Sequence, residues 1–201
     1  MSELFSIQLQ DQQQSSDGVW LDLPTTTEQV QAALRQIGIS SDNPQGLFIS
    51  GYFAEEEKRF AIPYNMVLAS NVDELNFLAS RLETLSTGER AELNAALQAP
   101  QSELFSIGRI TDFPENVDYY VHLPDVHGPA QLGDYYLNRS GMVDMPEEWK
   151  GGIDTAQFGR YVAQQEQGAF TQYGYLVKSG DEWQKVHEGQ PVPEEYRVLS
   201  F

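Results

Sequence analysis

The 201-residue sequence predicts an α+β fold in which three small domains follow one another in a line, first β-rich, then helical, then β-rich. Strand-like segments fill most of the first 64 residues, apolar residues recur at helical spacing from residue 70 to 98, and strand-like segments return from residue 103. We therefore expect domains over residues 1–64, 65–100 and 101–201.

The first predicted domain begins with two strands. Residues 2–7 read SELFSI, and a polar turn separates them from a second strand, VWLDL, that ends at a proline. Thr25 and Glu28 have capping-box spacing at the start of a short amphipathic helix, which Gly38 ends. A third strand is expected over residues 46–53.

The predicted middle domain consists of two helices. Ser70 and Asp73 are spaced as the N-terminal cap of the first helix, which carries leucines on one face. Ser86 and Glu89 are spaced as the cap of the second helix, which ends at Pro100. We interpret the leucines of both helices as core residues.

The predicted last domain opens with a repeat, because SELFSI recurs at residues 102–107. The same offset aligns residues 121–124 with 21–24, so either a duplication of β-rich modules or a chance identity explains the repeat. One helix is expected from near Asp154 to Gly168. The expected strands of this domain are LFSIGRI, VDYYVHL, FTQYGYLV and the terminal EYRVLSF.

The most unusual property of the sequence is its charge. Thirty Asp and Glu against 12 Lys and Arg give a formal net charge of −18 and a pI near 4.3. With 40% apolar and 11% aromatic residues the chain is expected to fold, so a folded surface carries this charge. Self-repulsion lowers stability. Three explanations compete: a surface for solubility, adaptation to high salt, and a field that attracts a cationic partner.

Several classes of protein are disfavoured. The absence of cysteine excludes disulfides and suits a reducing compartment. The N-terminus lacks a secretory pattern and no apolar run approaches the roughly 20 residues that span a bilayer, so a cytoplasmic location is expected. Anionic membranes and nucleic acids should both be repelled, so neither is an expected partner.

No catalytic constellation stands out, and we expect neither an enzyme nor a cofactor. His122, Asp125 and His127 form the one local metal-like cluster, but they lie in a predicted loop and no second cluster completes the ligands. Phosphate-loop, dinucleotide and EF-hand patterns are absent. We interpret the histidines as loop or surface residues and predict no metal.

The acidic residues are spread along the predicted elements and not gathered in a tail. Nine acids and one base precede residue 58, and nine acids against two bases lie between residues 82 and 138. Because duplex DNA carries about one charge per 1.7 Å, thirty carboxylates match roughly 50 Å of duplex. The spacing suits either a surface that imitates a phosphate ladder or an ordinary solvated acidic surface.

Three segments, in this order, resemble the ArdA antirestriction proteins of mobile genetic elements. They are Gly18–Pro24 (GVWLDLP) after the first strand, Val72–Ala79 (VDELNFLA) at the start of the helical middle, and Gly168–Tyr175 (GAFTQYGY) after a helix. The resemblance spans nearly the whole chain, and none of the three segments has a catalytic pattern. Its specificity therefore rests on their order and combination.

The resemblance implies a non-enzymatic mimic of B-form DNA, an elongated homodimer that occupies the DNA-binding groove of type I restriction-modification enzymes. It also implies that the dimer contacts lie in the C-terminal domain. There we expect apolar residues around Phe158 and Tyr161, or in the last strands, to contribute to the dimer interface. The acids that we expect to contact the partner are Asp22, Glu28, Glu74, Glu83, Glu89, Glu92, Asp112, Glu115, Asp118, Asp125 and Asp134.

Two other functions remain open at this point. An acidic adaptor that binds another basic protein would carry the same kind of surface on a different shape. A metal-dependent hydrolase would use scattered carboxylates, with the metal-like histidine cluster as its centre.

Overall fold

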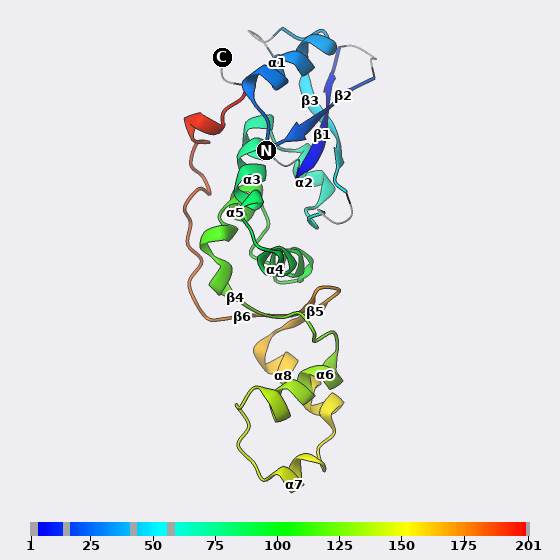
Figure 1. The fold of residues 1–201 in the computed structure, drawn as a ribbon, viewed down its shortest axis with the longest axis vertical. Coiled ribbons are helices and arrows are strands. Elements are labelled where there is room, and N and C mark those ends of the chain that lie inside the picture. Colours follow the sequence, from blue (N-terminus) through cyan, green and yellow to red (C-terminus); the bar gives the residue numbers. More distant parts are fainter. Residues whose placement is uncertain (1–3, 14–16, 41–43, 56–58, 200–201) are drawn as a thin grey trace. The chain divides into compact units, whose positions relative to one another are not determined.

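Figure 1 shows the computed structural model of the chain, which describes residues 4–13, 17–40, 44–55 and 59–199. Across these residues the secondary structure is mixed, with helices and two antiparallel three-stranded sheets. The α+β class is therefore confirmed. The chain divides into two compact units, and each unit is assembled from separate stretches of sequence.

Unit 1 comprises the described parts of Met1–Ser86, Leu104–Glu115 and Gln184–Phe201. In chain order its elements are β1 (Phe5–Asp11), β2 (Val19–Leu23), α1 (Thr27–Gln36), β3 (Leu47–Phe53), α2 (Tyr64–Leu68), α3 (Val72–Glu83), α5 (Ile107–Thr111) and the short 3₁₀ helices η2 (Phe113–Glu115) and η5 (Glu194–Tyr196).

Unit 2 comprises Thr87–Glu103 and Asn116–Trp183. Its elements are α4 (Thr87–Gln98), the 3₁₀ helix η3 (Val117–Tyr119), β4 (Tyr120–Leu123), α6 (Pro129–Asp134), the π-helical turn η4 (Tyr135–Arg139), α7 (Glu147–Lys150), α8 (Thr155–Glu166), β5 (Ala169–Thr171) and β6 (Gly174–Lys178).

The sheet of unit 1 has the strand order β2-β1-β3, drawn in blue to cyan in Figure 1. Alternate residues of β1, including Phe5, Ile7 and Leu9, are buried, so one face of the sheet belongs to the core and the other faces outward. Val30 and Leu34 of α1 are fully buried as well. The helix and the second and third expected strands are therefore confirmed. The first strand runs over Phe5–Asp11, later than the expected residues 2–7, of which residues 2 and 3 lie outside the described part of the chain.

The cap of α1 lies one residue later than the sequence analysis predicted. The Thr26 side chain accepts a hydrogen bond from the backbone N–H of Gln29, and the Gln29 side chain accepts one from the backbone N–H of Thr26. Thr25 is buried, and its backbone N–H donates to the side-chain oxygen of Asn76, 2.7 Å away. Glu28 follows in the first turn, where a carboxylate favours the helix dipole.

The cap of α3 is displaced in the same way. Asn71 and Glu74 form the capping box, with the Glu74 backbone N–H 2.9 Å from the Asn71 side-chain oxygen. The Ser70 hydroxyl instead donates to the backbone carbonyl of Met66 in the preceding helix, so it is not the cap. Asp73 is thereby left for a different contact, with the last described residues of the chain.

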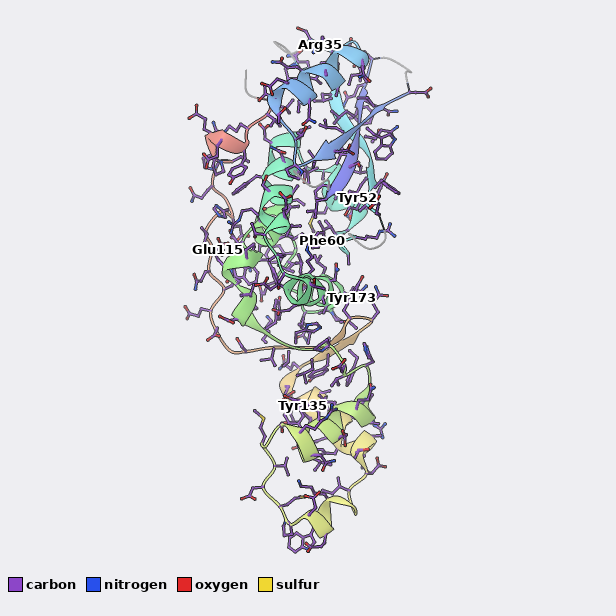
Figure 2. All side chains as sticks on the ribbon, in the orientation of Figure 1. Arg35, Tyr52, Phe60, Glu115, Tyr135 and Tyr173 are labelled. Atoms are coloured by element: carbon purple, nitrogen blue, oxygen red, sulfur yellow. The ribbon has the colours of Figure 1, made fainter. Side chains whose placement is uncertain are left out.

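The sheet of unit 2 has the order β4-β6-β5, with Tyr175 and Leu176 buried on β6. FTQYGYLV, expected as a single strand, instead forms a hairpin of β5 and β6, and Tyr173, labelled in Figure 2, lies in its turn. Helices α6 and α8 cross where Gly159 lies so close to α6 that an added Cβ would be 1.8 Å from the Pro129 carbonyl oxygen. Helix α8 begins next to Asp154 as expected, and the Asp154 side chain caps it by accepting a hydrogen bond from the backbone N–H of Gln157.

Two expected strands are wrong. The second SELFSI does not form a strand, because Ser106 caps α5 by accepting a hydrogen bond from the Arg109 backbone N–H. Ile107 and Ile110 are then buried at helical spacing. The terminal EYRVLSF includes part of η5 and forms no strand up to residue 199, and its last two residues lie outside the described part of the chain.

Candidate acidic interaction surface

The eleven acids predicted to contact a partner differ widely in exposure. Five of them are exposed, five are partly exposed and one is buried. The exposed ones are Asp22, Glu28, Glu115, Asp118 and Asp125. The partly exposed ones are Glu74, Glu83, Glu89, Glu92 and Asp134. Both units contribute to the exposed and to the partly exposed group.

Asp112 corrects the sequence analysis, because its side chain is completely buried and cannot belong to an exposed surface. Its carboxylate accepts hydrogen bonds from the backbone N–H groups of Val186, His187 and Glu188, the shortest of 2.6 Å. Nearby, Arg109 and Glu188 form an ion pair of 3.1 Å. Asp112 is therefore a structural anchor for the C-terminal segment of unit 1.

Glu115 and Asp134 are each paired with a basic side chain of the same unit. Glu115, labelled in Figure 2, forms a salt bridge with Arg81 of α3. Asp134 lies 3.3 Å from the Arg139 guanidinium. Part of the charge at these two positions is therefore already compensated within the chain.

Glu28 lies in the first turn of α1 and has a lowered pKa. Its own backbone N–H, followed by the Thr26 hydroxyl, holds the pKa of the carboxyl below its usual range. The side chain is exposed, so this carboxylate presents its negative charge to the solvent at neutral pH.

Glu92 behaves in the opposite way. Burial, and then the nearby carboxylates of Glu89 and Asp118, raise the pKa of Glu92 to about 8. Its buried Oε1 atom has no hydrogen-bond partner among the described residues. Glu92 is therefore largely uncharged at neutral pH. The three carboxyl groups of Glu89, Glu92 and Asp118 together carry less negative charge than their formal charge of −3.

The metal-like cluster predicted from the sequence is not brought together around an ion site. His122 lies on β4, and its Nε2 atom is 2.7 Å from the carbonyl oxygen of Tyr173 in the β5–β6 turn. Asp125 and His127 follow in the exposed loop before α6. Within the described residues, no group of three or more His, Cys, Asp or Glu side chains is placed to hold a metal ion.

The residues named for a dimer contact lie on α8. Phe158 is partly buried and Tyr161, three residues later, is 60% exposed. The spacing puts both on neighbouring positions of one helix face. Their role in a dimer stays a prediction.

Sequence reasoning missed how some acids are used inside the fold. Glu166, at the end of α8, accepts hydrogen bonds from the hydroxyls of Tyr136 and Tyr175. Glu103 accepts a hydrogen bond from Lys178, 2.6 Å away. No local pattern signals these contacts, because the partners lie up to 75 residues apart in the sequence.

The sequence analysis also missed a group of exposed aromatic side chains on unit 1. Trp20 and Phe53, on β2 and β3, are both at least half exposed. Alternation along β2 marks Trp20 as an outward-facing position. Alternation along β3 would place Phe53 on the same face as the buried Ile49, and the register shift in the pairing of β1 with β3 turns Phe53 outward instead, so the sequence pattern could not have found it or its contact with Trp20.

The comparisons with known proteins agree with the resemblance of the three segments. A family model described as "Antirestriction protein (ArdA)" matches residues 14–177. No curated protein matches the chain. None of the helices in the described residues is both long and apolar enough to span a membrane.

Proposed function

We propose how this chain acts from one premise: it belongs to the ArdA family of antirestriction proteins. The chain imitates B-form DNA and inhibits type I restriction-modification enzymes by occupying the groove in which their methyltransferase core binds DNA. It acts by binding and carries out no reaction of its own.

The observation that carries this proposal is the position of the exposed acids on folded elements of both units. Asp22 lies on β2, Glu28 on α1, and Asp118 on η3. Because each is held by secondary structure, their mutual arrangement within a unit is rigid, as imitation of a phosphate ladder requires. A disordered acidic tail would lack this order.

Electrostatics supplies both the rate and the strength of the proposed encounter. A net charge of −18 attracts a basic groove over a distance that the Debye length limits to about 10 Å at 0.1 M salt. Ion pairs formed across the contact then add affinity, which falls as salt is raised. Glu28, with its lowered pKa, keeps its charge throughout the physiological range.

The proposal includes a homodimer of elongated shape, built from three domains in a line and joined through the C-terminal domain around Phe158 and Tyr161. Small-angle scattering tests it, because a compact 201-residue domain has a radius of gyration of about 16 Å. A dimer mass with a markedly larger radius supports the proposal. A compact monomer contradicts it.

The decisive experiment is a competition between the chain and labelled duplex DNA for a purified type I methyltransferase, repeated from low to high salt. We expect displacement at low salt and a steep loss at high salt. Neutralising Glu28, Asp118 and Asp125 together, as Gln or Asn, should weaken displacement at low salt.

The matched control exchanges the same three residues for the other acid, as Glu28→Asp, Asp118→Glu and Asp125→Glu, which keeps the charge. It should displace DNA like the unsubstituted chain. Displacement that is independent of salt, or equal for the neutralised and the charge-retaining variants, contradicts the proposal.

A further inference from the structure

The outward face of the unit 1 sheet carries three exposed aromatic side chains, which together we call the aromatic face. Trp20 on β2 is 50% exposed, Phe53 on β3 is 58% exposed and Phe48 on β3 is 36% exposed. Large exposed aromatic groups gathered on one sheet face mark interaction sites in soluble proteins. Such groups are unexpected on a surface that works by charge alone.

The geometry of the sheet brings two of these rings together. Gln8 of the central strand pairs with Trp20 on one side and with Gly51 on the other. A Cβ added to Gly51 would lie 3.0 Å from the Cη2 atom of Trp20. The indole therefore reaches across β1 toward a position where β3 has no side chain, and the Trp20 and Phe53 rings meet edge to face with centroids 6.5 Å apart.

A carboxylate lies beside these rings. Ser6 pairs with Asp22 on one side and with Phe53 on the other, and its hydroxyl donates to the Asp22 carboxylate, 2.6 Å away. This bond shows that Asp22 points to the same face as the rings. The aromatic face thus combines exposed aromatic rings with a negatively charged side chain.

A guanidinium group has the chemistry that this combination recognises. Its plane stacks on aromatic rings, it is weakly hydrated, and its edge forms paired hydrogen bonds with a carboxylate. An ammonium group shares the charge but not the plane. We propose that the aromatic face binds arginine side chains of a basic protein partner, with the guanidinium against Trp20 and Phe53 and its charge facing Asp22.

Other occupants fit the face less well. A second copy of the chain would bring the Asp22 carboxylates of the two copies toward one another, and their like charges would repel. A nucleic acid would bring phosphates to the same carboxylates. This inference rests on the proposed function, because it takes the partner to be the basic groove of a restriction-modification enzyme. It adds that the chain binds arginine side chains in that groove.

The first experiment measures binding of the full chain to two fluorescent peptides, one of nine arginines and one of nine lysines, by anisotropy. We expect the arginine peptide to bind more tightly. Trp20→Ala and Phe53→Ala should each weaken binding of the arginine peptide roughly 3- to 30-fold and leave binding of the lysine peptide nearly unchanged. Trp149→Ala removes an indole that is 68% exposed on unit 2, and serves as the matched control.

Two results of this experiment overturn the inference. One is equal arginine-peptide binding by Trp20→Ala and the unsubstituted chain. The other is a dimer that dissociates in Trp20→Ala, which assigns the face to a second copy. If Trp20→Ala fails to fold by circular dichroism, Phe53→Ala decides, because its ring is the more exposed of the two.

The second experiment separates this inference from the proposed function. Each variant competes with duplex DNA for the type I methyltransferase. If Trp20→Ala and Phe53→Ala displace DNA fully while the variant neutralised at Glu28, Asp118 and Asp125 does not, the inference is wrong and the proposed function stands. If the unsubstituted chain displaces no DNA yet binds the arginine peptide through Trp20, the proposed function is wrong and the arginine-binding face stands.

Discussion

The carboxylate of Asp73 accepts a hydrogen bond from the backbone N–H of Val198, 2.7 Å away, and another from the adjacent Leu199 at 2.8 Å. These bonds tie the last described residues to the first turn of α3. Since Asn71 and Glu74 cap the helix, Asp73 is available for this long-range role.

Replacing Asp73 with Ala should therefore destabilise the protein without removing a helix cap. Two backbone N–H groups lose a charged acceptor, which costs about 1–3 kcal/mol in the free energy of unfolding. Urea denaturation measures the change, with Asp125→Ala in an exposed loop as the control. Equal stability of the two variants would show that Val198 and Leu199 are not held by Asp73.

Replacing Asp112 with Ala should be more damaging, because its carboxylate is buried and serves three backbone N–H groups. We expect a loss of about 3 kcal/mol or more in the free energy of unfolding. At a temperature where the variant is folded, its displacement of DNA from a restriction-modification enzyme should be normal, since Asp112 is not exposed. If the folded variant no longer displaces DNA from the enzyme, Asp112 contributes to the interaction with the partner and the interpretation of Asp112 as a purely structural residue is wrong.

Glu92 should make the stability of the protein depend on pH. The folded state holds this proton up to about pH 8, because burial and the charges of Glu89 and Asp118 raise the pKa of Glu92 above its ordinary value of 4.5. The unfolded chain releases it near pH 4.5, so the folded state binds more protons between these values. The contribution of Glu92 to stability therefore falls as pH rises through this window.

Glu92→Gln removes this titration. We compare the free energy of unfolding of the variant with that of the unsubstituted protein at each pH. This difference should be about 1–2 kcal/mol more favourable to the variant at pH 9 than at pH 5, a value that is discounted for partial solvent screening. Denaturant unfolding at both pH values gives the difference. Parallel pH dependence in the two proteins would mean that Glu92 ionises normally in the folded state.

Gly159 should tolerate no side chain, because α6 and α8 touch there. A methyl group would lie 1.8 Å from the carbonyl oxygen of Pro129 and 2.8 Å from the backbone nitrogen of Gly133. Gly159→Ala should lower the melting temperature sharply, with a loss of about 3 kcal/mol or more. Gly151→Ala, where no atom lies within 4 Å of the added group, is the matched control and should have little effect.

Local patterns were sufficient where a segment's neighbours along the chain decide its structure. The strands β2 and β3 lie where the sequence predicts them, and α8 begins after Asp154, close to its predicted start. The repeated SELFSI marks the limit of this reasoning. In the first copy Phe5 and Ile7 pair with β2, whereas in the second copy Ser106 caps α5, so the same six letters form different structures in different surroundings.

The candidate surface was predictable to a similar degree. That acids would be exposed on folded elements followed from composition, and Asp22, Glu28 and Asp118 are exposed. The role of Asp112 could not follow, because its hydrogen-bond donors lie 74 to 76 residues away in the sequence. The raised pKa of Glu92 likewise depends on burial that only the fold creates.

The C-terminal segment Gln184–Phe201 belongs to unit 1, and this affects the order in which the unit can be completed during synthesis. Phe77 of α3 packs against the rings of His187 and Tyr196, with centroids 4.9 and 4.7 Å apart. Both rings belong to the last segment of unit 1. A ribosome releases α3 well before this segment, so the face around Phe77 stays uncovered while unit 2 is synthesised. The part of the protein that is made first is therefore among the last to be completed.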